Sequence, residues 1–143
     1  MRQMKNCLLK WVWVVISSLF FSCNQVEMNI CFETDYVVLK IDSTGFLTSI
    51  YSKVDNIEYL SDKKSSPLLA LYAGNDEAIL PVSAWQIDEK VMLTYTNGAE
   101  AVIEIGEKEE YLTFKLISLT NRGKADHVVW GPYYTTIDRK SVG

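Results

Sequence analysis

The chain is 143 residues long, with 14 basic and 18 acidic side chains and one histidine, so its net charge is −4. This acidic balance argues against a nucleic acid as partner, because that binding depends on Lys and Arg neutralising phosphates. No stretch is of low complexity, and the sequence shows no internal repeat or heptad pattern. Length and composition therefore indicate one globular domain with its own hydrophobic core.

The first 23 residues have the order of a processed export segment. Three basic residues within the first ten precede a mainly apolar run over 11–21, and a serine then precedes Cys23. A run of about 11 residues is too short to cross a bilayer, which takes roughly 20. The order resembles a bacterial lipoprotein signal peptide, which implies removal of 1–22 and a lipid on Cys23. An uncleaved anchor, a buried helix and cleavage by ordinary signal peptidase are the alternatives.

Processing at Cys23 changes what the remaining chain contains. Three basic residues and no acidic residue leave with 1–22, so 11 basic residues face 18 acidic ones, a net charge of −7. Cys7 leaves as well and Cys23 carries lipid, so Cys31 is the one remaining thiol, and we expect it to be buried and inert. We expect no disulfide, no cysteine-based zinc site, no metal and no cofactor.

The export segment also predicts a location and a division of the chain. We expect a lipoprotein on the outer or cytoplasmic membrane, facing the periplasm or the exterior, or a secreted protein if Cys23 is not lipidated. We divide the chain into a signal peptide at 1–22, a tether at 23–29 and a β-sandwich domain at 30–143. The abrupt C-terminal end fits either a frayed terminus or the front piece of a longer protein.

Alternating apolar and polar residues, bounded by turn residues, predict strands along the whole domain. The patterns recur about every 8 to 12 residues, the spacing of an all-β sandwich, and no segment has the pattern of a long helix. The predicted strands cover 29–34, 36–41, 46–51, 57–60, 68–72, 84–87, 91–95, 99–105, 111–119 and 127–130, and 133–137 has the pattern of a further strand. The predicted fold is an antiparallel β-sandwich following an N-terminal signal segment.

Three local patterns in this series are specific. Gly45 ends the turn 42–45 at a position that requires a positive φ. Asn97-Gly98 between alternating strands is a strong hairpin signal. The continuous apolar run 68–72 predicts a strand buried on both faces.

The sequence carries no motif of a catalytic centre. His127 is the only histidine, and no Gly-x-Ser-x-Gly turn, glycine-rich phosphate loop or His-x-x-x-His pair is present. Glycan hydrolysis needs two carboxylates at a set separation. No pair stands out among the candidates, which are Asp35, Asp42, Glu58, Asp76, Glu77 and Glu104. We therefore assign no catalytic residue, and expect His127 to be a surface or edge side chain.

The aromatic residues suggest contact with sugar, because carbohydrate C–H faces stack on rings whose polar edges bond hydroxyls. Trp130, Tyr133 and Tyr134 flank a Gly-Pro pair whose irregular backbone can turn rings outward. We predict these three as carbohydrate contacts, with burial in the core as the alternative. Trp85, between two strand residues, is expected in the core.

Two longer segments carry a resemblance to a known superfamily. The hairpin 41–52, together with 56–60, is similar to the opening of many carbohydrate-active β-sandwiches, and 119–137 is similar to the N-terminal sandwich of large secreted glycan-degrading proteins. Over about 35–137 the chain resembles the galactose-mutarotase-like supersandwich domains. The resemblance implies a sandwich that packs on a downstream catalytic barrel or toroid. Active aldose epimerases of this fold use two histidines and a glutamate, and this chain has only His127.

Two functions follow as hypotheses. The first is a non-catalytic carbohydrate-associated domain of an exported lipoprotein, the N-terminal piece of a glycoside hydrolase. Its partners are a glycan or the downstream catalytic domain, and the membrane through lipid on Cys23. The second is a stand-alone envelope lipoprotein that binds a protein or a small ligand.

Overall fold

The computed structural model describes residues 29–74, 76–123 and 125–137. The predicted signal peptide at 1–22 and Cys23, the predicted site of lipid attachment, lie outside these residues. The described part contains twelve strands, all paired antiparallel, and no α-helix. Within it, no helix is both long enough and apolar enough to span a membrane. The all-β antiparallel fold predicted from the sequence is confirmed.

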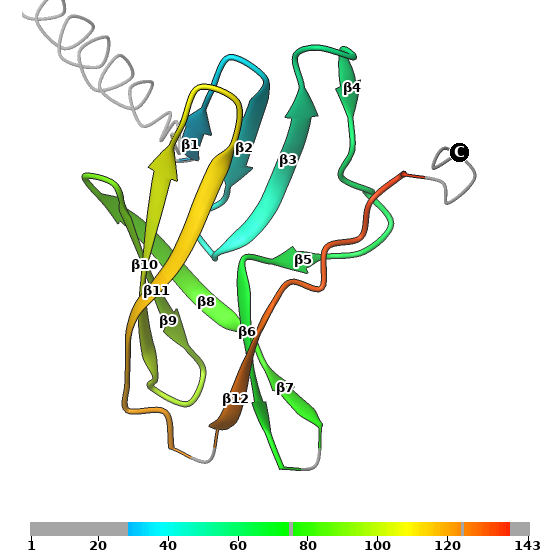
Figure 1. Cartoon of the computed structure of the whole chain (residues 1–143). Helices are drawn as coiled ribbons and strands as arrows, with labels where there is room; N and C mark the ends of the chain where they lie inside the picture. The colour runs from blue at the N-terminus through cyan, green and yellow to red at the C-terminus, as the bar shows by residue number, and fades with distance from the viewer. Residues whose placement is uncertain (1–28, 75, 124, 138–143) are drawn as a thin grey trace, which may run out of the picture.

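The strands follow one another along the chain with short connections (Figure 1). They are β1 Ile30–Glu33, β2 Val37–Ile41, β3 Phe46–Ser52, β4 Ile57–Glu58, β5 Ser66–Pro67, β6 Leu69–Ala73, β7 Glu77–Ile79, β8 Pro81–Ile87, β9 Lys90–Tyr95, β10 Glu100–Glu107, β11 Leu112–Thr120 and β12 Ala125–Trp130.

These strands form three sheets. The first has the order β1-β2-β3-β4, with β5 paired to the start of β3; the second is β11-β10-β9-β8; the third is β12-β6-β7. In the first sheet Phe32 pairs with Leu39 and both are buried, so alternate residues of this hairpin face the core. In the second, Ile103 pairs with Val91 and both are fully buried.

The two larger sheets and β6 share one core in a sandwich-like arrangement. Leu68 to Leu71 have no exposed surface, which confirms the predicted strand buried on both faces. Backbone hydrogen bonds tie the sheets together at both ends of the sandwich. The Asp35 N–H donates to the Glu109 carbonyl over 3.1 Å, and the Ala84 N–H donates to the Ser43 carbonyl over 2.7 Å.

Both predicted glycine turns are present. Gly45 has φ +92° and Gly98 has φ +79°. At the second turn the Gly98 N–H donates to the Tyr95 carbonyl, and the Tyr95 N–H to the Ala99 carbonyl. Gly45 is also packed, since a Cβ there would lie 2.9 Å from Leu93 Cδ2. This turn therefore requires glycine for conformation and for space.

Two burial predictions were wrong for the same reason. Cys31 is exposed, because Ile30 and Phe32 on either side of it face the core and alternation turns Cys31 outward. Trp85 pairs with Met92 on the outer face of the second sheet and is 36% exposed. Side-chain direction along a strand, rather than residue type, placed both.

The strand pattern was wrong at the end of the described chain. Residues 133–137 form no strand; they make one isolated bridge, Leu60 to Thr135. The segment follows Gly131, at φ +87°, and Pro132, which has no N–H to donate to a ladder. Two further strands, β5 and β7, were not predicted, and β4 ends at Glu58 rather than at residue 60.

Candidate functional site

The segment after β12 places the three predicted carbohydrate contacts. A Cβ on Gly131 would lie 2.6 Å from the Tyr133 nitrogen, so only glycine permits this tight exit from the strand. Trp130 and Tyr133 are each 38% exposed, and Tyr134 is half-buried. The irregular exit predicted from the Gly-Pro pair is present, and it sends the three rings to different neighbours.

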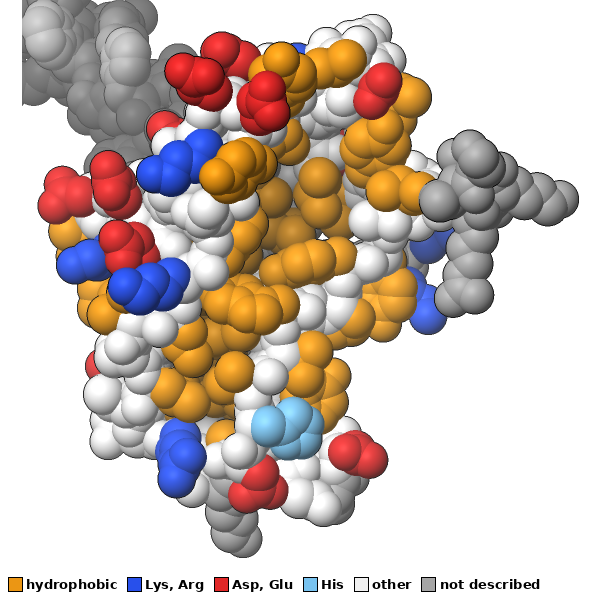
Figure 2. Space-filling model, viewed as in Figure 1, with side chains coloured by type: hydrophobic (Ala, Val, Ile, Leu, Met, Phe, Trp, Pro, Cys, Tyr) orange, Lys and Arg blue, Asp and Glu red, His pale blue; other side chains and the backbone are white. Residues whose placement is uncertain are grey.

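Tyr133 lines an apolar hollow between the first sheet and β11, and Trp130 borders this hollow through its contact with Phe114. We define the apolar hollow, of about 270 Å³, chiefly by Leu39, Leu47, Ile50, Leu112, Phe114 and Tyr133. Figure 2 shows hydrophobic side chains gathered in a depression in the middle of this face, with acidic side chains along its upper rim. The Trp130 ring tilts against Phe114, with 6.0 Å between ring centroids.

The Tyr133 hydroxyl makes a hydrogen bond within the protein. It donates to the Leu68 carbonyl over 2.8 Å. Burial of the phenol raises the pKa of Tyr133 to about 12. The hydroxyl therefore anchors the ring against the strand, and the hollow that the ring borders is almost entirely apolar.

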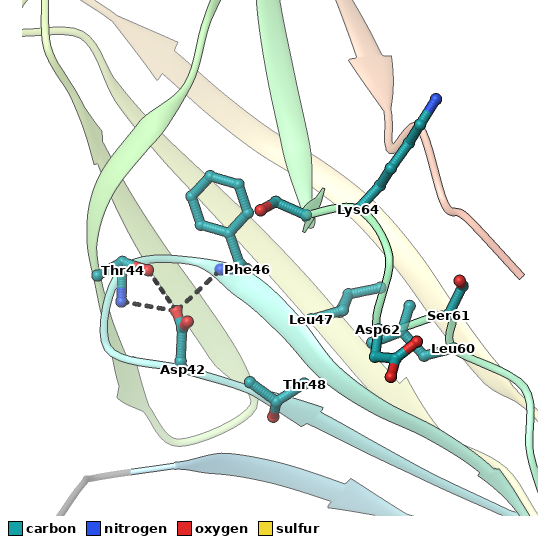
Figure 3. A pocket seen from close by; sticks show the side chains of 10 residues that line it. Asp42, Thr44, Phe46, Leu47, Thr48, Leu60, Ser61, Asp62 and Lys64 are labelled. Carbon is teal, nitrogen blue, oxygen red and sulfur yellow. Dashed lines mark hydrogen bonds between the residues drawn. The ribbon is translucent and has the colours of Figure 1, made fainter.

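A second depression lies on the other side of β3 and is polar. We define the polar pocket, of about 510 Å³, by the polar residues Asp42, Thr44, Thr48, Ser61, Asp62 and Lys64, with Phe46, Leu47 and Leu60 as apolar lining. Figure 3 shows the turn with Asp42 and Thr44 on one side, the loop with Ser61 and Asp62 on the other, and β3 between them.

The Asp42 turn forms the first wall of the polar pocket. The Asp42 Oδ1 atom accepts hydrogen bonds from the Thr44 N–H at 2.8 Å, the Thr44 hydroxyl at 2.6 Å and the Phe46 N–H at 3.0 Å. These bonds close a rigid Asx turn. Every hydrogen bond to this carboxylate among the described residues goes to Oδ1, so Oδ2 is available to a ligand.

Glu58 fixes the opposite wall. Its carboxylate accepts hydrogen bonds from the Ile50 N–H at 2.7 Å, the Leu60 N–H at 2.9 Å and the Ser49 hydroxyl at 2.6 Å. Burial raises the pKa of Glu58, but these bonds and the charge of Lys40 outweigh it, so the net pKa is lowered. Glu58 thereby braces Leu60 and Ser61 against β3.

Tyr134 joins the polar pocket through Lys64. The Lys64 Nζ atom lies 4.7 Å from the centre of the Tyr134 ring. In Figure 3 the Lys64 side chain extends away from Asp42 and Thr48. The Ser61 N–H donates to the Tyr134 carbonyl over 2.7 Å, and the Tyr134 N–H donates to the Ser66 hydroxyl over 3.1 Å. Tyr134 therefore stands beside this pocket, whereas Trp130 and Tyr133 border the apolar hollow.

The comparisons with known proteins add no relative. No protein-family model, curated protein or solved structure matches the chain. Membership of the galactose-mutarotase-like superfamily therefore stays a prediction. The site has to be interpreted from its own side chains.

The chemistry of the polar pocket suits binding. Carboxylates accept hydrogen bonds, Lys64 donates them and hydroxyls do both, which is the complement of a neutral, hydroxyl-rich ligand. Among the described residues, no group of three or more His, Cys, Asp or Glu is placed to hold a metal ion. His127 lies on the surface, with its ring stacked on Tyr72 at 5.3 Å between centroids.

Sequence reasoning identified part of this site and missed the rest. Asp42 and its turn were recognised, but Asp62 and Lys64 fell between the predicted strands 57–60 and 68–72 and were not singled out. The missed signal is the polar run 61–66 itself. A dense polar run between two apolar segments, returning next to an aspartate turn, is typical of a binding loop.

Proposed function

We propose that this chain is a non-catalytic, carbohydrate-associated β-sandwich of an exported lipoprotein, and that it accompanies the catalytic part of a glycan-degrading enzyme. The observation that carries the proposal is the polar pocket, whose lining combines the Asp42 and Asp62 carboxylates and several hydroxyls with the Phe46 ring. Sites for small polar ligands combine an apolar surface with a few convergent polar groups, as here. The export segment supports an encounter with glycans outside the cytoplasm.

The pocket favours a sugar over an anion. Asp42 and Asp62 stand on opposite walls, with Lys64 between the pocket and Tyr134. The two carboxylates repel an anion, whereas sugar hydroxyls can donate hydrogen bonds to both. The hydroxyls of Thr44 and Thr48 lie along the same lining.

Of the three predicted carbohydrate contacts, we retain Tyr134. The Tyr134 ring lies beside the polar pocket. A sugar stacked on this ring would have its own hydroxyls directed toward Asp62. Trp130 and Tyr133 border the apolar hollow, where sugar hydroxyls would lose their water hydrogen bonds without gaining partners. We therefore do not extend the sugar proposal to these two residues.

The test measures retention of the protein on immobilised polysaccharides. The panel contains an α-glucan, a β-glucan, a xylan and a galactan. We expect retention on at least one of them, and a loss of about tenfold or more in Asp62→Ala and in Tyr134→Ala, since each removes a polar or stacking contact worth about 1–3 kcal/mol. Circular dichroism checks that both variants fold.

The matched control is Tyr36→Ala, which removes an exposed ring just before β2, at the end of that strand opposite the Asp42 turn. Its retention should equal that of the unmodified protein. Trp130→Ala should also leave retention unchanged. Retention that falls in Trp130→Ala but not in Asp62→Ala would place the sugar on the hollow and contradict the proposed site. No retention on any polysaccharide would contradict the function.

The second hypothesis, an envelope lipoprotein that binds a protein, is favoured by one observation, the apolar hollow. Large exposed apolar patches mark contacts with other proteins. A cooperative melt of the purified protein, without exposed apolar surface detected by dye binding, would favour a self-sufficient domain. Aggregation and strong dye binding would favour a domain that needs a partner.

A further inference from the structure

The strand β11 has a free edge beside the apolar hollow. Within the described residues β11 pairs with β10 along one side only, over Leu112–Thr120. An edge strand exposes a row of backbone N–H and C=O groups that another strand can bond. The side chains on its inner face that border the hollow, Leu112 and Phe114, are only partly buried.

The facing sheet continues where the second sheet stops. In Figure 1 β3 and β4 lie beyond β11, on the side away from β10. Ile50 of β3, which is only partly buried, lines the hollow together with the exposed Phe114, and the buried Leu47 lines it as well. One more strand beside β11 would cover these side chains and satisfy the free edge together.

The residues that flank β11 carry opposite charges at the two ends of the strand. Glu109 and Glu110 precede β11, and Glu110 is the one charged residue among the described residues that line the hollow. Arg122 follows the strand at its other end. A complementary strand therefore carries a basic residue at the Glu110 end.

We propose that this face docks one extended strand of a partner polypeptide, which adds to the free edge of β11, inserts alternate apolar side chains into the hollow and sets a basic residue beside Glu110. Main-chain hydrogen bonds to β11 supply affinity, and the hollow selects the apolar positions. The inference does not depend on sugar binding. A second copy fits less well. Because β3 and β4 lie beyond β11 in Figure 1, two chains paired through β11 would bring β3 and β4 of each chain against the first sheet of the other.

The test uses the purified protein and a synthetic strand peptide, Thr-Val-Thr-Leu-Thr-Val-Lys, blocked at both ends. Antiparallel to β11, this peptide places its lysine at the Glu110 end. At a peptide concentration about ten times its Kd, we expect amide exchange over 112–120 to slow about tenfold. The melting temperature should rise, and exchange over the internal strand β9 should change less than exchange over 112–120.

Two modified peptides distinguish strand addition from apolar adhesion. N-methylation of the amides facing β11 should abolish binding, and N-methylation of the amides on the other edge should preserve it. Equal binding of the two peptides would overturn the proposal. So would the absence of binding by the unmodified peptide up to its solubility limit.

Charge exchange tests the orientation. Glu110→Lys should weaken binding of the lysine peptide about two- to fivefold, and strengthen binding of a peptide ending in glutamate by a similar factor. Tyr111→Lys, at a rim residue that is 58% exposed, should weaken both peptides without unfolding the domain. An unchanged preference in Glu110→Lys would overturn the orientation. A concentration-dependent dimer in sedimentation, abolished by Tyr111→Lys, would assign the face to a second copy instead.

Discussion

The Lys64 ammonium group lies 4.7 Å from the centre of the Tyr134 ring, which joins the loop after β4 to the segment after β12. These segments are about 70 residues apart in the sequence, and the Ser61 N–H bonded to the Tyr134 carbonyl holds them together. The polar pocket therefore has one wall that depends on a contact between distant parts of the chain. No sequence pattern within either segment predicts that contact.

Removing the Lys64 charge should change the stability of the fold little and the binding of polysaccharide more. An exposed cation–π contact is worth about 0.5–1 kcal/mol, so Lys64→Gln should lower the free energy of unfolding by no more than that. Retention on the polysaccharide that the protein binds should fall more steeply, because both the ammonium donor and the placement of the Tyr134 ring are lost. Chemical denaturation and retention measure the two effects. Lys63→Gln, at a neighbouring exposed lysine outside the pocket lining, is the control and should change neither.

Replacing Gly45 should be more damaging than replacing Gly98. Both have positive φ, so alanine costs about 1 kcal/mol or more at either position. At Gly45 the new Cβ would also lie 2.9 Å from Leu93 Cδ2, and overpacking a core adds about 1–3 kcal/mol. At Gly98 a Cβ meets no atom of the described part of the chain within 4 Å. Urea denaturation of Gly45→Ala and Gly98→Ala isolates the packing cost as their difference, and equal losses would contradict it.

The strands and turns were predictable because their causes are local. Alternation at residues 30–33 and the positive φ required at Gly45 are properties of a few neighbouring residues. The exposure of Trp85 was not predictable in this way. A strand alternates between two faces whatever its residues are, and which face meets the core is decided by the sheet it joins.

The candidate site was predictable only in part. The Asp42 turn follows from an aspartate that bonds its own following backbone, a local cause. The loop that carries Asp62 is held beside the segment that carries Tyr134 by the bridge between Leu60 and Thr135, which is a long-range pairing of single residues. Sequence periodicity does not predict such a bridge, so the wall of the polar pocket that depends on it was not predicted.

Ionisation of Tyr133 should destabilise the fold at high pH. Its pKa is raised from 10 to about 12, so the protonated phenol is favoured in the folded state. The stability that the protonated Tyr133 phenol contributes to the folded state is complete below pH 10 and is lost as the pH rises toward 12. Tyr133→Phe should therefore lose less stability than the unmodified protein between pH 10 and pH 12. Thermal melts across this range measure the difference, and Tyr111→Phe, at an exposed rim residue, should follow the unmodified protein.

Protonation of Glu58 should loosen the wall of the polar pocket at low pH. Hydrogen bonds from Ser49, Leu60 and Ile50 stabilise its carboxylate, so its pKa in the folded protein lies below the value of 4.5 for an unperturbed group. A group with a lowered folded pKa contributes stability above its unfolded pKa and loses it as the pH falls through the folded pKa. The unmodified protein should therefore lose this contribution below pH 4.5.

Glu58→Gln removes the charge and keeps one carbonyl acceptor, so the variant should be less stable than the unmodified protein at pH 7. The gap between them should narrow as the pH falls below 4.5, because the unmodified side chain then becomes neutral as well. Denaturation at a series of pH values measures the gap. Glu100→Gln serves as the control, since Glu100 is exposed on the outer face of β10 and takes part in none of the side-chain hydrogen bonds of the described residues. A gap for Glu58→Gln that stays constant between pH 7 and pH 3 would mean that the brace depends on the shape of the side chain and not on its charge.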